Sequence, residues 1–121
     1  MEYVRKIDFA TLATIDDQIV LPLVGPDAGL TGCSINCIRT PPGGGSPAGL
    51  HTHPVDQVFY VLSGEMRVEI AGHEYEGSAG TLIVFPANVP HRNWNAGSEA
   101  TLHLAINSPL PEPGTPFTRP A

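Results

Sequence analysis

At 121 residues the chain has the length of one domain, which buries roughly two thirds of the surface of its unfolded form and so keeps its own core. The formal charge of -6 comes from 12 acidic and 6 basic residues, with no segment rich in Lys or Arg, which excludes nucleic acid and anionic membranes as expected partners. The 13 glycines and 13 prolines lie between short apolar runs and exclude a fold of many long helices. We expect an all-β protein whose partner is a small molecule.

We expect no targeting signal in the N-terminal segment. It has no basic stretch followed by an apolar core, and the chain nowhere contains 18 consecutive apolar residues. We therefore expect a cytoplasmic protein that is not bound to a membrane. Asp8, followed by Phe9, Leu12 and Ile15, predicts a short helix that is capped by the aspartate.

Short apolar segments between turn residues predict strands along the rest of the chain. Residues 18–24 form the first, where Pro22 indicates an edge strand or a bulge, and residues 30–39 form the second. Residues 65–70 alternate apolar and charged side chains, so this strand has one buried face, and the hairpin turn at 71–73 leaves His73 exposed. Further strands are predicted over 51–62, 80–85, 91–95 and 101–106. Their regular spacing indicates an antiparallel sandwich or barrel.

Two cysteines, Cys33 and Cys37, lie in the second predicted strand. Four residues of strand span about 13 Å, whereas a disulfide needs Cα atoms within ~7 Å. We interpret both as small apolar side chains rather than as a disulfide, with a redox or metal-binding role as the alternative.

The C-terminal segment contains five prolines, at positions 109, 111, 113, 116 and 120. Proline lacks the backbone N–H that a strand ladder uses, so the segment is expected to be extended and to pair with no strand. We divide the chain into a β domain over 1–107 and a proline-rich tail over 108–121.

The segment from Gly45 to Gly64 holds the first candidate site residues. His51 and His53 lie two residues apart, and Gln57 follows four residues later. Side chains alternate between the two faces of an extended strand, so these three should point to one interior. Phe59 has the same parity and is expected to line that interior, where its ring can stack on a substrate.

The strand at 101–106 offers a fourth imidazole. Thr101, His103 and Ala105 share one face by parity. Because Thr101 and Ala105 are small, they leave room for a ligand beside His103, and Thr101 is a candidate substrate contact.

The spacing of these residues continues into a second motif, and together the two motifs resemble those of the cupins. The first cupin motif runs glycine, five residues, His-x-His, three or four residues, Glu, six residues, glycine, and it matches Gly45, His51, His53, Gln57 and Gly64. The second runs glycine, five residues, Pro-x-Gly, two residues, His, three residues, Asn, and it matches Gly80, Pro86, His91 and Asn95, with Asn88 in place of the second glycine.

This resemblance implies a jelly-roll barrel, a homodimer and a divalent metal ion inside the barrel. His51, His53 and His91 are its implied ligands, and the candidate ions are zinc, iron, nickel and manganese. Gln57 occupies the position of the family's glutamate, so a neutral amide stands where an anionic ligand is usual. Gln57 then either binds through its carbonyl oxygen or lies beside the ligands.

The neutral ligand set suggests a strong Lewis acid, since no ligand reduces the charge of the ion. His103 can serve as an acid or base next to it, or as a fourth imidazole ligand. This composition resembles that of the cupin polyketide cyclases, which implies enolisation, cyclisation or isomerisation of an oxygenated small molecule. The alternatives are an iron(II) dioxygenase of a diketone or phenolic substrate, and a cupin that binds a small molecule or sugar without turnover.

Overall fold

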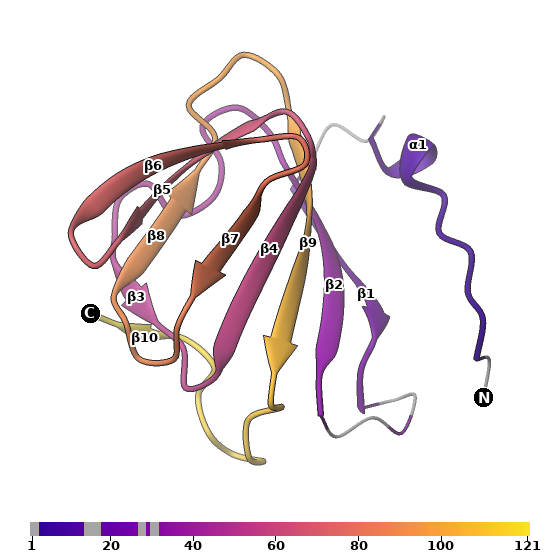
Figure 1. The fold of residues 1–121 in the computed structure, drawn as a ribbon, viewed down its shortest axis with the longest axis vertical. Coiled ribbons are helices and arrows are strands. Elements are labelled where there is room, and N and C mark those ends of the chain that lie inside the picture. Colours follow the sequence, from indigo (N-terminus) through magenta and orange to yellow (C-terminus); the bar gives the residue numbers. More distant parts are fainter. Residues whose placement is uncertain (1–2, 14–17, 27–28, 30–31) are drawn as a thin grey trace.

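A computed structural model describes residues 3–13, 18–26, 29 and 32–121, and it confirms the all-β jelly-roll prediction (Figure 1). The strands form two antiparallel sheets. The first sheet has the order β1 (Ile19–Val24), β2 (Ser34–Thr40), β9 (Thr101–Ser108), β4 (Asp56–Ser63) and β7 (Leu82–Phe85). The second has the order β10 (Arg119–Pro120), β3 (His51–Thr52), β8 (His91–Trp94), β5 (Glu65–Ile70) and β6 (His73–Ser78).

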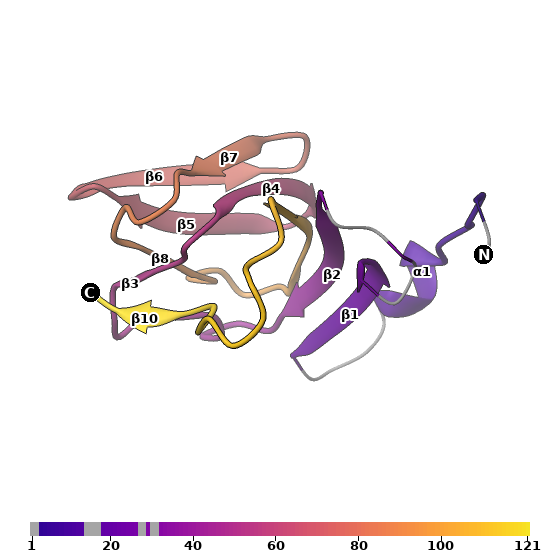
Figure 2. The ribbon, with the colours of Figure 1, turned by 90° about the horizontal axis from the view of Figure 1, so that it is seen from below.

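The N-terminal segment lies beside β1, at the side of the barrel farthest from β10 (Figure 1 and Figure 2). It contains the helix α1 (Phe9–Leu12), and the carboxylate of Asp8 accepts hydrogen bonds from the backbone N–H of Thr11 at 3.0 Å and from its hydroxyl at 2.7 Å. The predicted cap is therefore present, whereas Ile15 lies outside the described residues. Within the described ranges, no helix has the length and hydropathy of a membrane span.

Strands β1 and β5 follow the sequence prediction. β1 lies at the edge of the first sheet, and its pairing with β2 shifts register between Pro22 and Val24, as the proline indicated. In β5, Met66 and Val68 are buried, and the turn into β6 leaves His73 exposed. The thiols of Cys33 and Cys37 are both free, and Cys37 is buried.

The hydrophobic core fills one part of the space between the two sheets. Phe59 and Val61 on β4, Met66 and Val68 on β5, and Ile83 and Phe85 on β7 meet Ala105 on β9. The rings of Phe59 and Phe85 pack edge to face with centroids 4.7 Å apart. The rest of the interior holds a cavity that is lined by histidines and other polar side chains together with Ile38, Phe59 and Phe117.

The prediction that His51, His53 and Gln57 share one continuous strand is wrong. β3 ends at Thr52, and the chain crosses from the second sheet to the first before β4 begins at Asp56. Pro54 lies in this crossing, where its missing N–H removes no ladder bond. The three side chains nevertheless line one cavity, because His51 and Gln57 come from opposite sheets that face each other.

The prediction that the proline-rich tail pairs with no strand is also wrong. Arg119 pairs with Thr52 and Pro120 pairs with His51, so β10 adds an edge strand to β3. The N–H of Ala121 donates to the carbonyl of Leu50 at 3.1 Å. A proline is tolerated in this position because β10 has no further neighbour in its sheet.

Candidate metal centre

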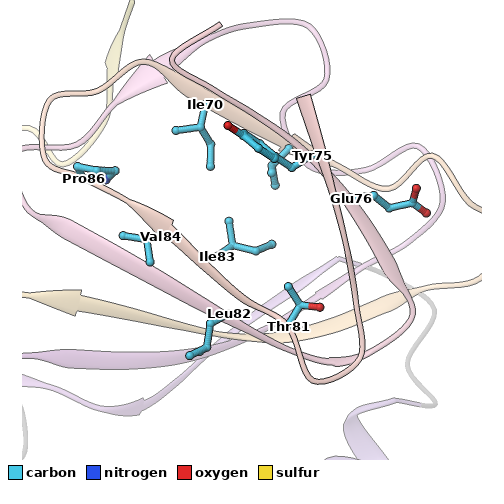
Figure 3. Close-up of a pocket in the computed structure, with 9 residues that line it drawn as sticks. Ile70, Tyr75, Glu76, Thr81, Leu82, Ile83, Val84 and Pro86 are labelled. Atoms are coloured by element: carbon cyan, nitrogen blue, oxygen red, sulfur yellow. The ribbon is translucent and has the colours of Figure 1, made fainter. Parts of the chain in front are cut away.

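Two of the hollows in the described part of the chain differ clearly in character. One is a cavity of about 310 Å³ between the sheets, lined by residues that include His51, His53, His103 and Gln57. The other is a groove of about 450 Å³ at the open edge of the sandwich, lined mainly by apolar side chains of β5, β6 and β7 (Figure 3). No histidine lines the groove, whereas three line the cavity, so the cavity is the candidate site.

Three imidazoles gather at one end of the cavity. His51 on β3 lies directly opposite His91 on β8, and His53 follows directly after β3. The ring centroids are 4.4 Å apart for His51 and His91, and 4.9 Å apart for each of the other two pairs. One nitrogen from each ring lies within 4.8 Å of the other two, so the three side chains can hold one metal ion.

Backbone carbonyls orient two of these rings. The Nδ1 of His91 lies 3.0 Å from the carbonyl oxygen of Val89, and the Nδ1 of His53 lies 2.9 Å from that of Phe117. A carbonyl only accepts, so each Nδ1 carries the proton and each Nε2 carries the lone pair. This arrangement is the usual one for histidines that bind a metal through Nε2.

The Nε2 of His91 is the atom that best tests whether the site suits a metal. It is buried, and no hydrogen-bond partner exists for it among the described residues. A buried lone pair without a partner costs about 1–3 kcal/mol. A divalent ion accepts such a lone pair, so this donor set fits a metal.

Burial also keeps these imidazoles in the form that binds metals. Desolvation lowers the pKa of His91 to about 4, and it lowers the pKa of His53 as well. The neighbouring histidines add to both effects, because a second positive charge nearby is unfavourable. Both rings are therefore neutral near pH 7, and a neutral imidazole is the metal-binding form.

Gln57 lies on β4, across the cavity from His51, and is buried. Its Nε2 donates a hydrogen bond to the Oδ1 of Asn107 at 2.9 Å, and Asn107 in turn donates to the hydroxyl of Ser34 at 3.2 Å. This chain of hydrogen bonds uses the amide nitrogen of Gln57. The carbonyl oxygen remains as the polar atom that Gln57 can offer to the cavity.

His103 is placed in the same cavity by β9, and its side chain is completely buried. Its ring packs against Phe59 with centroids 4.2 Å apart. Neither ring nitrogen has a hydrogen-bond partner in the described part of the protein, and burial lowers its pKa to about 4. His103 therefore offers a neutral, unpartnered imidazole to the cavity that His51 and His53 also line, outside the group of three that can hold one ion.

The two predicted substrate contacts lie in different surroundings. Phe59 lines the cavity, as its parity indicated. Thr101 shares the inward face of β9 with His103 and is buried, with a hydroxyl that has no partner among the described residues, but it does not line the cavity wall. A substrate contact at Thr101 stays a prediction.

The sequence reasoning missed two contributors to the site. Asn107 continues the parity of Thr101, His103 and Ala105, so extending that strand by two residues finds it. Phe117 stacks on His53, with centroids 4.3 Å apart and an angle of 26° between the rings. Its only signal in the sequence is an aromatic residue within a proline-rich tail.

A turn between β7 and β8 holds the second motif in place. Asn88 has φ of 62°, a left-handed angle that favours glycine and that asparagine tolerates better than most residues. Its N–H donates to the carbonyl of His53 at 2.8 Å, and it thereby joins the second motif to the first. This explains how asparagine can occupy the position of the motif's second glycine.

Comparisons with known proteins agree with this architecture. The sequence profile of the cupin domain matches residues 37–107. Germin-like protein 3-5 of Oryza sativa subsp. japonica is 34% identical over 96 residues, which cover 71% of this chain and 41% of the germin-like protein, so the chain spans about two fifths of that relative.

Solved structures show the same fold at lower identity. A conserved protein of unknown function from Streptococcus pyogenes is 24% identical with a TM-score of 0.71, over 92% of both chains. The polyketide cyclase RemF from Streptomyces resistomycificus is 20% identical with a TM-score of 0.72, over 87% of this chain and 71% of RemF. With the profile match over more than half of its length, the chain belongs to the cupin family.

Proposed function

We propose that this cupin binds a divalent metal ion through His51, His53 and His91, with the carbonyl oxygen of Gln57 as a further ligand. We propose further that it promotes the enolisation, and with it the cyclisation or isomerisation, of an oxygenated small molecule. The observation that carries the proposal is the buried Nε2 of His91, which has no partner among the described residues and belongs to a cluster of three imidazoles. The candidate ions are zinc, iron, nickel and manganese.

The charge of the cavity supports an enolisation. The described residues that line the cavity include no Asp, Glu, Lys or Arg. A divalent ion bound by neutral donors would keep its full charge and would supply Lewis acidity toward a substrate oxygen. The site therefore favours a substrate that becomes an anion as it reacts.

His103 is the proposed acid–base residue. It faces the cavity, it is neutral near pH 7, and its nitrogens have no partner among the described residues. A neutral imidazole can accept a proton from a carbon next to a carbonyl group and return it elsewhere. The ring of Phe59 packs against His103 and gives the substrate an apolar wall.

Metal binding is tested by purification without chelators, followed by reconstitution with each candidate ion and measurement of the metal content. We expect about one equivalent per chain, and a loss of binding in His53→Ala. Less than about 0.1 equivalent with every ion would contradict the proposal. Retained stoichiometric metal in His53→Ala would show that the ligands are different.

The chemistry is tested on the metal-loaded protein with a β-diketone and related enolisable ketones. Exchange of the α-proton for deuterium, or turnover with zinc in the absence of oxygen, would support the enolisation. Oxygen uptake with iron(II) would instead identify a dioxygenase. Metal binding without either reaction, across a broad panel of such ketones, would identify a binding protein.

A further inference from the structure

We propose that the tail residues 117–121 form a positioning element that fixes His53 for metal binding. The inference rests on the proposed function, because it takes His53 as a metal ligand. It assigns a role to a segment that lies outside both histidine motifs and outside the region that matches the cupin profile.

The contacts between Phe117 and His53 carry the inference. The Nδ1–H of His53 donates to the carbonyl oxygen of Phe117 at 2.9 Å, and the ring of Phe117 stacks on the imidazole at 4.3 Å. The hydroxyl of Thr118 lies 3.4 Å from the same Nδ1. One side of the imidazole is thus held by the tail, and its Nε2 is left for the cavity.

The backbone of the tail is itself fixed next to the histidine strand. β10 pairs with β3 at Arg119 and Pro120, and Ala121 adds a hydrogen bond to Leu50. On its other side, β3 pairs with β8 through His51 and His91. The short strand that carries His51 is therefore held between β8 and the tail.

His91 shows why the tail matters specifically for His53. The acceptor for the Nδ1 of His91 is Val89, only two residues away, so this orientation comes with the motif itself. The acceptor for His53 is 64 residues away in the sequence. Changes in the tail should therefore loosen His53 and leave the orientation of His91 intact.

Two variants test the inference, and two more serve as controls. Removal of residues 117–121 should raise the dissociation constant for zinc about 10- to 100-fold, the range that is typical when the group supporting a metal-bound histidine is lost. Phe117→Ala removes the stacked ring but keeps a backbone carbonyl, so we expect a smaller rise of roughly threefold to tenfold, with recovery in Phe117→Tyr. Leu110→Ala, in the same tail but outside the cavity, should stay within about twofold.

The tautomer of His53 in the metal-free protein gives a second readout, by NMR of the imidazole nitrogens. In the full-length protein we expect the proton on Nδ1, whereas the truncated protein and Phe117→Ala should show exchange between both tautomers. His91 should keep its proton on Nδ1 in all variants, because Val89 still accepts it, and this also shows that the barrel is folded.

The two readouts separate failure of the inference from failure of the proposed function. If neither the tautomer nor the zinc affinity changes in Phe117→Ala and in the truncated protein, the tail does not position His53. If no protein binds zinc but the tautomer changes, the metal proposal fails while the positioning of His53 stands. If the truncated protein is unfolded, Phe117→Ala alone decides by the same criteria.

Discussion

The cavity lined by histidines and the groove lined by β5, β6 and β7 are both hollows of this barrel, but the side chains of their walls differ in chemistry. The groove is the larger, about 450 Å³ against about 310 Å³ for the cavity, and it exposes Leu82 and Val84, with 65% and 57% of their surface accessible. The cavity instead is lined by His103, which is 0% exposed, and by His51 and His53, which form a cluster with His91, 1% exposed. Of these two hollows, size alone would favour the groove as the binding site. The buried imidazoles, which can bind a metal or transfer a proton, belong to the cavity instead.

The difference shows what makes a hollow a candidate site. Exposed aliphatic side chains are common on protein surfaces and need no ligand. A buried imidazole nitrogen without a hydrogen bond is unfavourable until a metal ion or a hydrogen-bond donor binds its lone pair. The cavity therefore has an energetic reason to bind a ligand, and the groove has none.

Loss of a ligand from the cavity should have the largest effect. His91→Ala removes the nitrogen that is buried and unpartnered in the described structure, so we expect the dissociation constant for zinc to rise at least about 100-fold. Isothermal titration with zinc measures the change. His73→Ala, at the exposed turn before β6, serves as the matched control and should bind zinc like the unmodified protein. Unchanged zinc affinity in His91→Ala would mean that His91 is not a ligand, and the cavity would then have no advantage over the groove as a metal site.

Much of the cavity could be predicted from the sequence, because motif spacing is a strong signal. Both motifs placed His51, His53, Gln57 and His91 around one interior, and strand parity placed His103 with them. The prediction that His51, His53 and Gln57 lie on one strand was nevertheless wrong, because the chain passes from one sheet to the other near Pro54. Parity cannot reveal such a crossing, because it assumes that a strand continues.

The tail could not be predicted for a different physical reason. Its prolines correctly indicate a chain that avoids helix and inner strands. The pairing of β10 with β3, however, depends on an open strand edge that only the folded barrel creates. The contact of Phe117 with His53 is likewise a consequence of tertiary structure, and no local pattern encodes it.

A change in ligand charge should have a smaller effect than loss of a ligand. In Gln57→Glu a carboxylate enters a cavity whose described lining has no formal charge, so we expect zinc to bind about 10-fold more tightly. The added negative charge should weaken the Lewis acid and slow turnover. Titration and steady-state kinetics measure the two effects. Tighter binding with unchanged turnover would contradict the role that we give to the neutral ligand set.

Acid sensitivity should distinguish the buried His103 from an exposed histidine. Burial lowers the pKa of His103 from 6.5 to about 4, so below pH 6.5 the unfolded chain binds a proton that the folded protein does not. Stability should therefore fall as the pH falls from 6.5 to 4, by up to roughly 3 kcal/mol from this residue at about 1.4 kcal/mol per pKa unit. Urea unfolding in the presence of a chelator measures this slope.

The His103→Leu variant should have a shallower pH slope than the unmodified protein. His73→Leu, which replaces the exposed histidine at the turn, should keep the full slope. Equal pH slopes in all three proteins would mean that the imidazole of His103 is in contact with water. Its pKa would then not differ from that of an exposed histidine.

The smallest effect is expected in the groove itself. Leu82 lies on the edge strand β7 and is 65% exposed. Leu82→Ser therefore removes little buried apolar surface, and the new hydroxyl can hydrogen-bond to water. We expect the free energy of unfolding to change by less than about 0.5 kcal/mol, as is usual for exposed positions, and zinc affinity to stay the same. Urea unfolding and zinc titration test both values. A loss of several-fold in zinc affinity would show that the groove and the cavity are coupled through the core at Ile83, and the two hollows would have to be treated as one site.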